Sequence, residues 1–205
     1  MSTHLLLVRH GQIAANVEQR WHGSTDGPLT ARGQEQAGWV AAYLARTHPH
    51  VAAVYASPLQ RAQDTGAPIA TALHLPLRTL AGLAEYGIGD LENETYDDLL
   101  GRHRFFDLAG GDITWAPPNG ESLDAVGRRI KAAWGQIADA HPGQEVVVVG
   151  HGAAMAIGIA VALHADPRAW FQYRTRNTSV SEIEFDAVVR LVAFDVADHL
   201  ADAGH

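Results

Sequence analysis

Two apolar runs in this sequence end in nearly the same way, and they constrain the fold more than any other feature. Leu5-Leu-Leu-Val8 is followed by Arg9-His10-Gly11, and Val146-Val-Val-Val149 is followed by Gly150-His151-Gly152. Neither run alternates between apolar and polar residues, which is typical of strands that are covered on both faces. The sequence therefore predicts an α/β fold with a mainly parallel sheet, in which two histidines follow two strands.

The rest of the chain alternates strands and helices, as such a sheet requires. We expect a third buried strand over residues 51–56. Helices are expected over residues 30–46 and 58–73, with Thr30 and Ser57 as N-caps, and over residues 122–140. Two late apolar runs, over residues 180–185 and 189–194, predict an antiparallel hairpin.

Residues 87–120 interrupt this alternation, because they are rich in glycine, proline and aromatic side chains. We interpret this segment as a cap insertion that packs over one end of the sheet. The whole chain of 205 residues has the length of one domain, so residues 1–205 are expected to form a single domain with this cap.

The expected strand ends bring a chemically consistent set of side chains together. Ligands of open α/β sheets bind outside the carboxyl ends of the strands, so His10 and His151 are expected at one rim. Arg9 and Arg61, the second lying one turn into the helix after the third strand, add two guanidinium groups. Guanidinium groups pair with phosphate oxygens, and a neutral imidazole is a competent nucleophile for phosphoryl transfer. Glu85, just before the cap, lies where an acid for the leaving oxygen is needed.

Several blocks of this sequence together resemble the histidine phosphatase superfamily, the phosphoglycerate-mutase-like enzymes. The resemblance extends in order from about residue 5 to residue 194, and it implies a three-layer α/β/α sandwich with a mainly parallel sheet. The blocks are Arg9-His10-Gly11, Ser57-Pro-Leu-Gln-Arg61-Ala, Glu85 with Gly89, Gly120-Glu-Ser122 and His151-Gly152.

The resemblance also implies a role for each matching side chain. His10 corresponds to the histidine that becomes phosphorylated, and Glu85 corresponds to the proton donor. The remaining matches belong to the phosphoryl pocket, namely Arg9, Arg61 and His151, with Asn16 as a further phosphate contact. We add His22, Gly23 and Gly152 as substrate-binding candidates.

The chain departs from the family pattern around the expected substrate. Ile13 replaces a Thr or Ser, His22-Gly23 replaces Gln-Gly, and Leu91-Glu92-Asn93 replaces Trp-Glu-Gly. None of these changes removes a group that the chemistry needs. We therefore expect the changes to affect specificity rather than activity.

These observations predict a metal-independent phosphomonoester hydrolase that acts through a phosphohistidine on a small phosphorylated metabolite, either a sugar phosphate or a phosphoglycerate derivative. A 2,3-bisphosphoglycerate-dependent phosphoglycerate mutase is one alternative. Family mutases, however, tend to have a longer insertion and a Glu-Arg-His-Tyr-Gly-like block in place of Glu85-Tyr-Gly-Ile-Gly89. A non-catalytic relative that binds a phospho-ligand is the other alternative, and it would be expected to lack the nucleophile or the acid.

The amino-acid composition excludes several other kinds of function. The chain has no cysteine, which excludes a thiol nucleophile and cysteine-ligated metals, and a net charge of −8 argues against nucleic-acid binding. No apolar stretch predicts a signal peptide or a membrane span, so we expect a cytoplasmic protein with no membrane contact. No cofactor and no metal are expected, and the twelve histidines are interpreted as mainly surface residues. The late hairpin leaves an edge strand that could pair in a homodimer.

Overall fold

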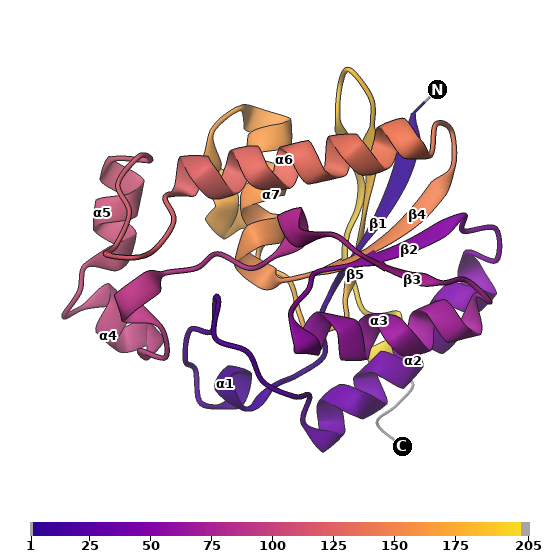
Figure 1. Ribbon diagram of the computed structural model, residues 1–205, viewed down its shortest axis with the longest axis horizontal. Helices are drawn as coiled ribbons and strands as arrows, with labels where there is room; N and C mark the ends of the chain where they lie inside the picture. The colour runs from indigo at the N-terminus through magenta and orange to yellow at the C-terminus, as the bar shows by residue number, and fades with distance from the viewer. Residues whose placement is uncertain (1, 202–205) are drawn as a thin grey trace.

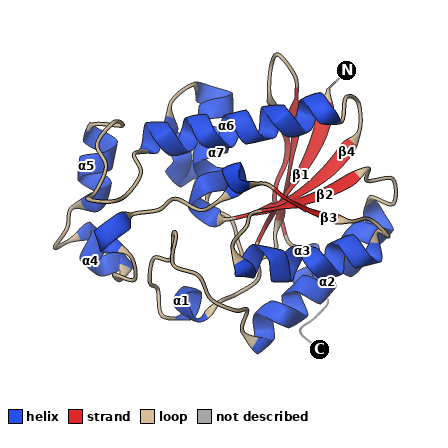
Figure 2. Cartoon of the chain, viewed as in Figure 1, coloured by secondary structure: helices blue, strands red, loops and turns tan. Residues whose placement is uncertain are grey.

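A six-stranded mixed sheet forms the centre of the molecule, and helices cover both of its faces (Figures 1 and 2). The structure is a computed structural model that describes residues 2–201. The strand order is β3-β2-β4-β1-β5-β6. Strands β1 to β4 are parallel to one another, β5 is antiparallel to β1, and β6 is antiparallel to β5. The expected α/β fold with a mainly parallel sheet is confirmed. The strands are β1 Thr3–Arg9, β2 Ala53–Ala56, β3 Leu77–Thr79, β4 Glu145–Gly150, β5 Val180–Phe185 and β6 Arg190–Val196.

The helices fall into two layers and a cap. In Figure 1, α2 and α3 lie on one side of the sheet, α6 and α7 lie on the other, and α4 and α5 lie beyond one end of α6. None of the helices within residues 2–201 is long and apolar enough to cross a membrane. The α-helices are α1 Ala14–Val17, α2 Ala31–Thr47, α3 Gln60–Ala72, α4 Tyr96–Leu100, α5 Phe105–Gly111, α6 Leu123–Ala140, α7 Gly152–His164 and α8 Asp198–Ala201, and the 3-10 helices are η1 Ala81–Leu83, η2 Gly89–Leu91 and η3 Pro167–Tyr173.

The central strands are apolar throughout because they separate two hydrophobic cores. Leu5 and Leu7 of β1 belong to a core that contains buried residues of α6 and α7. Leu6 and Val8 belong to a second core, with buried residues of α2 and α3. Successive side chains of a strand point to opposite faces, so a strand covered on both faces needs an apolar residue at every position.

The predicted helix starts are correct in two cases and wrong in one. Thr30 caps α2 by accepting a hydrogen bond from the Gly33 amide at 3.0 Å. Ser122, the expected start of the last long helix, caps α6. Ser57 does not cap α3, which begins at Gln60 with Leu59 as the N-cap residue. The Ser57 hydroxyl accepts a hydrogen bond from the Leu59 amide at 3.3 Å and lies 2.7 Å from Nε2 of His151. The short edge strand β3 was not predicted, because its three residues form no continuous apolar run.

The topology places three functional segments at one edge of the sheet. β1, β2 and β4 are parallel neighbours, and His10, Ser57 and His151 follow their carboxyl ends. On the cap side, Trp21 packs edge-on against Tyr86 and lies close to the rings of the cap and of η3. The site is therefore bounded by strand ends on one side and by an aromatic cap on the other.

A close approach of α6 and α7 generates a testable prediction. A Cβ added at Gly158 of α7 would lie 2.4 Å from Cγ2 of Ile130 and 2.7 Å from a ring atom of Trp134, both on α6. We expect Gly158→Ala to lower the free energy of unfolding by about 1–3 kcal/mol, because overpacking outweighs the higher helix propensity of alanine.

Gly135 of α6 is the matched control, because a Cβ added there meets nothing within 4 Å. We expect Gly135→Ala to leave the stability unchanged or to raise it by up to about 1 kcal/mol. Urea unfolding of both variants measures the difference. Equal stability of the two variants would contradict the close helix contact.

Candidate active site

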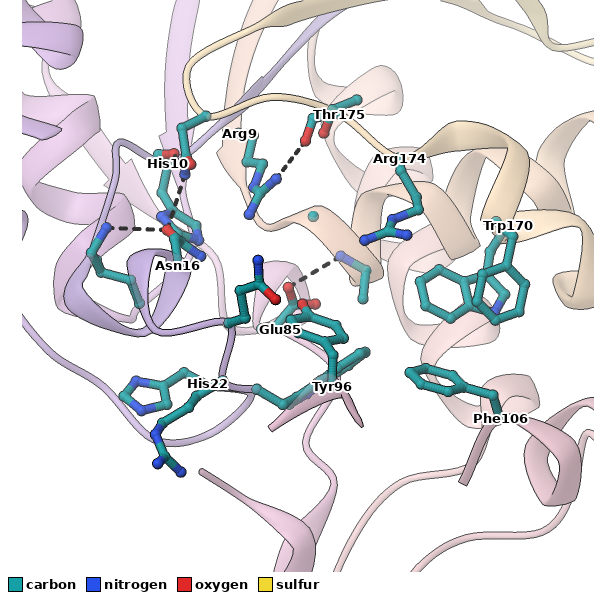
Figure 3. A pocket seen from close by; sticks show the side chains of 18 of the residues that line it. Arg9, His10, Asn16, His22, Glu85, Tyr96, Phe106, Trp170, Arg174 and Thr175 are labelled. Atoms are coloured by element: carbon teal, nitrogen blue, oxygen red, sulfur yellow. Dashed lines mark hydrogen bonds between the residues drawn. The ribbon is translucent and has the colours of Figure 1, made fainter. Parts of the chain in front are cut away.

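A cavity of about 650 Å³ lies between the carboxyl end of β1 and the cap. Its inner part is lined by Arg9, His10, Asn16 and Glu85, together with the first residues of α7. Its outer part is lined by residues of α4, α5 and the segment from η3 to β5. Figure 3 shows side chains from both parts directed toward the same space. The candidate catalytic groups therefore open onto a chamber that is much larger than a phosphate ion.

His10 has its nucleophilic nitrogen free. Its ring is 4 % exposed, and Nδ1 lies 2.7 Å from the Gly11 carbonyl oxygen. A carbonyl oxygen only accepts hydrogen bonds, so Nδ1 carries the proton and Nε2 keeps its lone pair. Burial lowers the pKa of His10 well below 6.5, and the charges of Arg9 and Arg61 lower it further. His10 is therefore a neutral imidazole at neutral pH.

His151 is a second buried neutral imidazole, 5.2 Å from His10 between ring centroids. Arg61 Nε donates a hydrogen bond to its Nδ1 at 3.2 Å, so the proton of the neutral ring lies on Nε2, beside the Ser57 hydroxyl. Burial lowers the pKa of His151, and the charges of Arg61 and Arg9 lower it further. The two histidines therefore have opposite tautomers.

Arg61 is placed differently from the sequence-based expectation of a direct phosphate contact. It is 0 % exposed and is not among the cavity-lining residues. Its Nη2 donates to the carbonyl oxygens of His22 and Gly23, at 3.0 and 2.8 Å, and its Nη1 donates to the Thr25 carbonyl oxygen at 2.8 Å. In this arrangement Arg61 positions His151 and the 22–25 loop from behind the cavity.

Arg9 and Asn16 have free donors at the inner end of the cavity. Arg9 Nη1 donates to the Thr175 carbonyl oxygen, while its buried Nε has no partner among residues 2–201. Asn16 Oδ1 accepts from the amide of Ile13 at 3.1 Å and from Nδ2 of Asn177 at 3.2 Å. The Asn16 amide group is thereby oriented, and its NH₂ has no partner among the described residues. These N–H groups suit phosphoryl oxygens.

Glu85 lies at the N-terminus of α7, beside this inner end (Figure 3). Its Oε1 accepts from the amides of Tyr86 and Ala154, at 2.8 and 2.7 Å, and its Oε2 accepts from the Ala153 amide at 3.1 Å. These three amides fix the orientation of the Glu85 carboxyl group at the N-terminus of α7. Gly152, the first residue of α7, leaves room for the side chain of Arg9, because a Cβ at that position would lie 3.2 Å from Nε of Arg9.

Arg129 holds the segment that carries Glu85 in place. Its guanidinium donates to the carbonyl oxygens of Ala84 and Glu85, at 2.8 and 3.2 Å. It also forms a salt bridge with Glu121 at 2.8 Å. The Gly120-Glu-Ser122 block therefore acts through Arg129 on the position of the expected proton donor.

The 22–25 loop depends on Glu92, whose role sequence analysis did not identify. Oε2 of Glu92 accepts from the amides of Gly23 and Thr25, and Oε1 accepts from the amides of Ser24 and Ile88, at 2.9 to 3.1 Å. Of the two candidates in this loop, His22 lines the cavity. Gly23 is not among the lining residues and instead fits closely against the Tyr86 carbonyl oxygen.

Sequence analysis also missed the contribution of residues 170–177. Trp170, Phe171, Arg174, Thr175 and Asn177 all line the cavity. These residues belong to the end of η3 and the irregular segment between η3 and β5, which has no recognisable sequence pattern. Among residues 2–201, no group of three or more histidine, aspartate or glutamate side chains is arranged to hold a metal ion.

Comparison with known proteins links this geometry to one family. A family model described as histidine phosphatase superfamily (branch 1) matches residues 5–193. Three mycobacterial proteins are 36% identical to the chain over 189 residues, and the chain spans 51% of their length. Probable phosphoglycerate mutase GpmB of Escherichia coli O1:K1 is 30% identical over 204 residues, which cover 97% of this chain and 93% of that protein.

Two solved structures are similar over nearly the whole chain. Phosphoserine phosphatase of Entamoeba histolytica, in complex with 3-phosphoglyceric acid, has a TM-score of 0.86 and 27% identity, covering 97% of this chain and 99% of that chain. Mycobacterial glucosyl-3-phosphoglycerate phosphatase Rv2419c, in complex with VO3, has a TM-score of 0.84 and 27% identity, covering 95% of this chain and 99% of that chain.

The four amides around Glu92 generate a prediction about the stability of the site. In Glu92→Gln the new NH₂ group faces two amide donors, so two hydrogen bonds are lost. We expect the free energy of unfolding to fall by about 1–3 kcal/mol. Glu94→Gln is the control, because Glu94 forms a surface pair with Arg102 and its loss should cost less than about 1 kcal/mol. Urea unfolding measures both, and equal losses would contradict the role of Glu92.

The buried neutral histidines generate a prediction about pH. The pKa values of His10 and His151 are lowered in the folded state, so below pH 6.5 the unfolded chain binds protons that the folded chain does not. Stability is therefore highest above pH 6.5 and falls as the pH decreases, by up to about 1.4 kcal/mol per pH unit for each histidine that stays neutral.

Removal of one histidine should make this pH dependence shallower. We expect His10→Ala to reduce the slope between about pH 6.5 and 5.5 by up to one proton, while the exposed control His50→Ala leaves the slope unchanged. Urea unfolding at a series of pH values measures the slopes. A wild-type slope that His10→Ala does not change would show that His10 is protonated in the folded state.

Proposed function

Because the chain belongs to the histidine phosphatase superfamily, we propose that it hydrolyses small phosphomonoesters through a phosphohistidine at His10. Two observations carry the proposal. His10 is neutral with Nε2 free, and it shares one cavity with Arg9, Asn16 and Glu85. A non-catalytic relative would be expected to lack the nucleophile or the acid, and this chain has both.

In the first step, Nε2 of His10 attacks the phosphorus in line with the departing oxygen. The N–P bond forms and the P–O bond to the alcohol breaks, while Glu85 in its protonated form donates its proton to the alcohol oxygen. Arg9 and Asn16 stabilise the phosphoryl oxygens electrostatically. His151, which is 0 % exposed and is not among the cavity-lining residues, packs beside His10 instead of contacting the phosphoryl group. Oε2 of Glu85, which accepts a single backbone hydrogen bond, is the oxygen better placed to carry the proton.

In the second step, water hydrolyses the phosphohistidine. Glu85, now a carboxylate, accepts a proton from the water as its oxygen attacks phosphorus, and the N–P bond breaks to release inorganic phosphate and neutral His10. Positive charge at the phosphoryl group comes from arginine, so no step is assigned to a metal ion.

The outer part of the cavity has room for a substrate whose alcohol part is larger than the phosphoryl group. A cavity of about 650 Å³ is in the size range of sites for ring-sized ligands. Its walls include the rings of Tyr96, Phe106, Trp170 and Phe171, which offer flat apolar surfaces. Two similar structures are phosphatases of phosphoserine and of glucosyl-3-phosphoglycerate. We therefore propose a sugar phosphate or a phosphoglycerate derivative as substrate.

Phosphoglycerate mutase activity is the second candidate, because the chain resembles GpmB over most of its length. A mutase must keep water away from the phosphohistidine until the phosphoryl group returns to a bound intermediate. At the mouth of this cavity, Leu100 is 60 % exposed and Phe171 is 47 % exposed. Such an open mouth favours hydrolysis, and an assay for interconversion of 3- and 2-phosphoglycerate with added 2,3-bisphosphoglycerate separates the two activities.

The proposed nucleophile generates a prediction about turnover. We expect His10→Ala to lower kcat for p-nitrophenyl phosphate at least about 10³-fold, because the phosphohistidine cannot form, while circular dichroism shows a folded chain. His50→Ala, at an exposed position, is the control and should retain wild-type activity. Chelation of divalent metals should leave the wild-type rate unchanged. Hydrolysis retained in His10→Ala, or activity that requires added magnesium, would overturn the mechanism.

A further inference from the structure

Arg174 presents an unpaired cation to the cavity. It lies between η3 and β5 and lines the chamber, yet it forms no hydrogen bond and no ion pair with any residue among 2–201. Figure 3 shows its guanidinium directed into the space between Arg9, Glu85 and Trp170. Arg20, which also lines the chamber, is by contrast held by Glu18 at 3.4 Å and by the Asn93 carbonyl oxygen at 2.8 Å.

The position of Arg174 separates it from the groups that bind the phosphoryl end. Arg9, Asn16 and His10 come from the carboxyl end of β1 and the segment after it, whereas Arg174 follows the aromatic wall formed by Trp170 and Phe171. Burial lowers the pKa of Arg9, and the positive charge of Arg174 lowers it further. A ligand that spans the cavity therefore meets one cation at its phosphoryl end and a second cation beside its alcohol part.

We propose that Arg174 binds a carboxylate on the alcohol part of the substrate, so that the protein prefers phosphomonoesters of hydroxy acids to phosphomonoesters of neutral alcohols. This inference rests on the proposed phosphatase function and adds a specificity-determining residue to it. A guanidinium presents two parallel N–H groups that match the two oxygens of a carboxylate.

A carboxylate fits this place better than a second phosphate does. A phosphate dianion calls for more than one cation, and the other arginine of the outer chamber, Arg20, already has partners. Asp97 also lines the chamber, so a second phosphate dianion would bring two negative charges beside an existing carboxylate, whereas a substrate carboxylate brings one. The single unpaired guanidinium of Arg174 can pair with that one charge.

The test compares two substrates that differ in one group. 3-Phosphoglycerate carries a carboxylate where glycerol 3-phosphate carries a hydroxymethyl group. The measured quantity is the ratio of kcat/KM for 3-phosphoglycerate to kcat/KM for glycerol 3-phosphate. We expect this ratio to fall about 10- to 100-fold in Arg174→Met and to be partly retained in Arg174→Lys, which keeps the charge but not the paired donors.

Arg168→Met is the matched control. Arg168 lies in the same segment and is exposed, but it pairs with Asp166 at 3.6 Å and does not line the cavity. We expect it to keep the wild-type ratio. An equal loss for both substrates in Arg174→Met would place Arg174 at the phosphoryl group or at Glu85 and would overturn the inference. A larger loss for fructose 1,6-bisphosphate than for 3-phosphoglycerate would assign Arg174 to a second phosphate and would also overturn it.

A binding measurement separates this inference from the proposed function. Calorimetry on His10→Ala compares the Kd of 3-phosphoglycerate with the Kd of glycerol 3-phosphate without any turnover. We expect the carboxylate to bind more tightly, and the preference to disappear in the double variant His10→Ala/Arg174→Met. If the wild type hydrolyses no phosphomonoester, the proposed function fails while this comparison still decides the role of Arg174. Equal Kd values for the two ligands would overturn the inference.

Discussion

The buried guanidinium of Arg61 is the interaction on which the rest of the site depends. It joins α3 to His151 after β4 and to the 22–25 loop, three segments that are distant in the sequence. Burial lowers the pKa of Arg61, and the nearby carboxylates of Glu85 and Asp26 counteract this effect. A guanidinium stays charged in proteins and only donates hydrogen bonds. Its partners are therefore fixed as acceptors, and the tautomer of His151 is fixed with them.

The fold could be predicted from the sequence for the central strands but not for the start of α3. The runs Leu5–Val8 and Val146–Val149 predict buried parallel strands correctly, because only strands between two cores remain apolar at every position. Ser57 followed by proline has the local pattern of a helix start. The helix begins three residues later, at Gln60. The Ser57 hydroxyl accepts a hydrogen bond from the Leu59 amide before the helix, and it also contacts His151, which lies 94 residues away in the chain and could not be found from a local pattern.

The candidate site was predictable where its residues follow strands and unpredictable where contacts alone define it. His10 and His151 follow apolar runs, so their place at one edge of the sheet can be derived from the sequence. Glu92 and Arg174 have no such pattern. The role of Glu92 depends on four backbone amides that only the folded 22–25 loop and Ile88 bring together, and Arg174 is notable only because the described structure gives it no partner.

The two halves of the cavity are built from different kinds of element, with the ends of central strands on the inner side and short helices and irregular segments on the outer side. His10 and His151 follow central strands whose backbones are paired on both sides, so small displacements there disturb two hydrophobic cores. The outer half comes from short helices and irregular segments, with Leu100 and Phe171 exposed at the mouth. Substitutions in the outer half can alter which alcohol is accepted without moving the nucleophile. The departures from the family pattern, such as Ile13 and His22, line the cavity around the buried catalytic pair, whose positions are set by strand pairing and by Arg61.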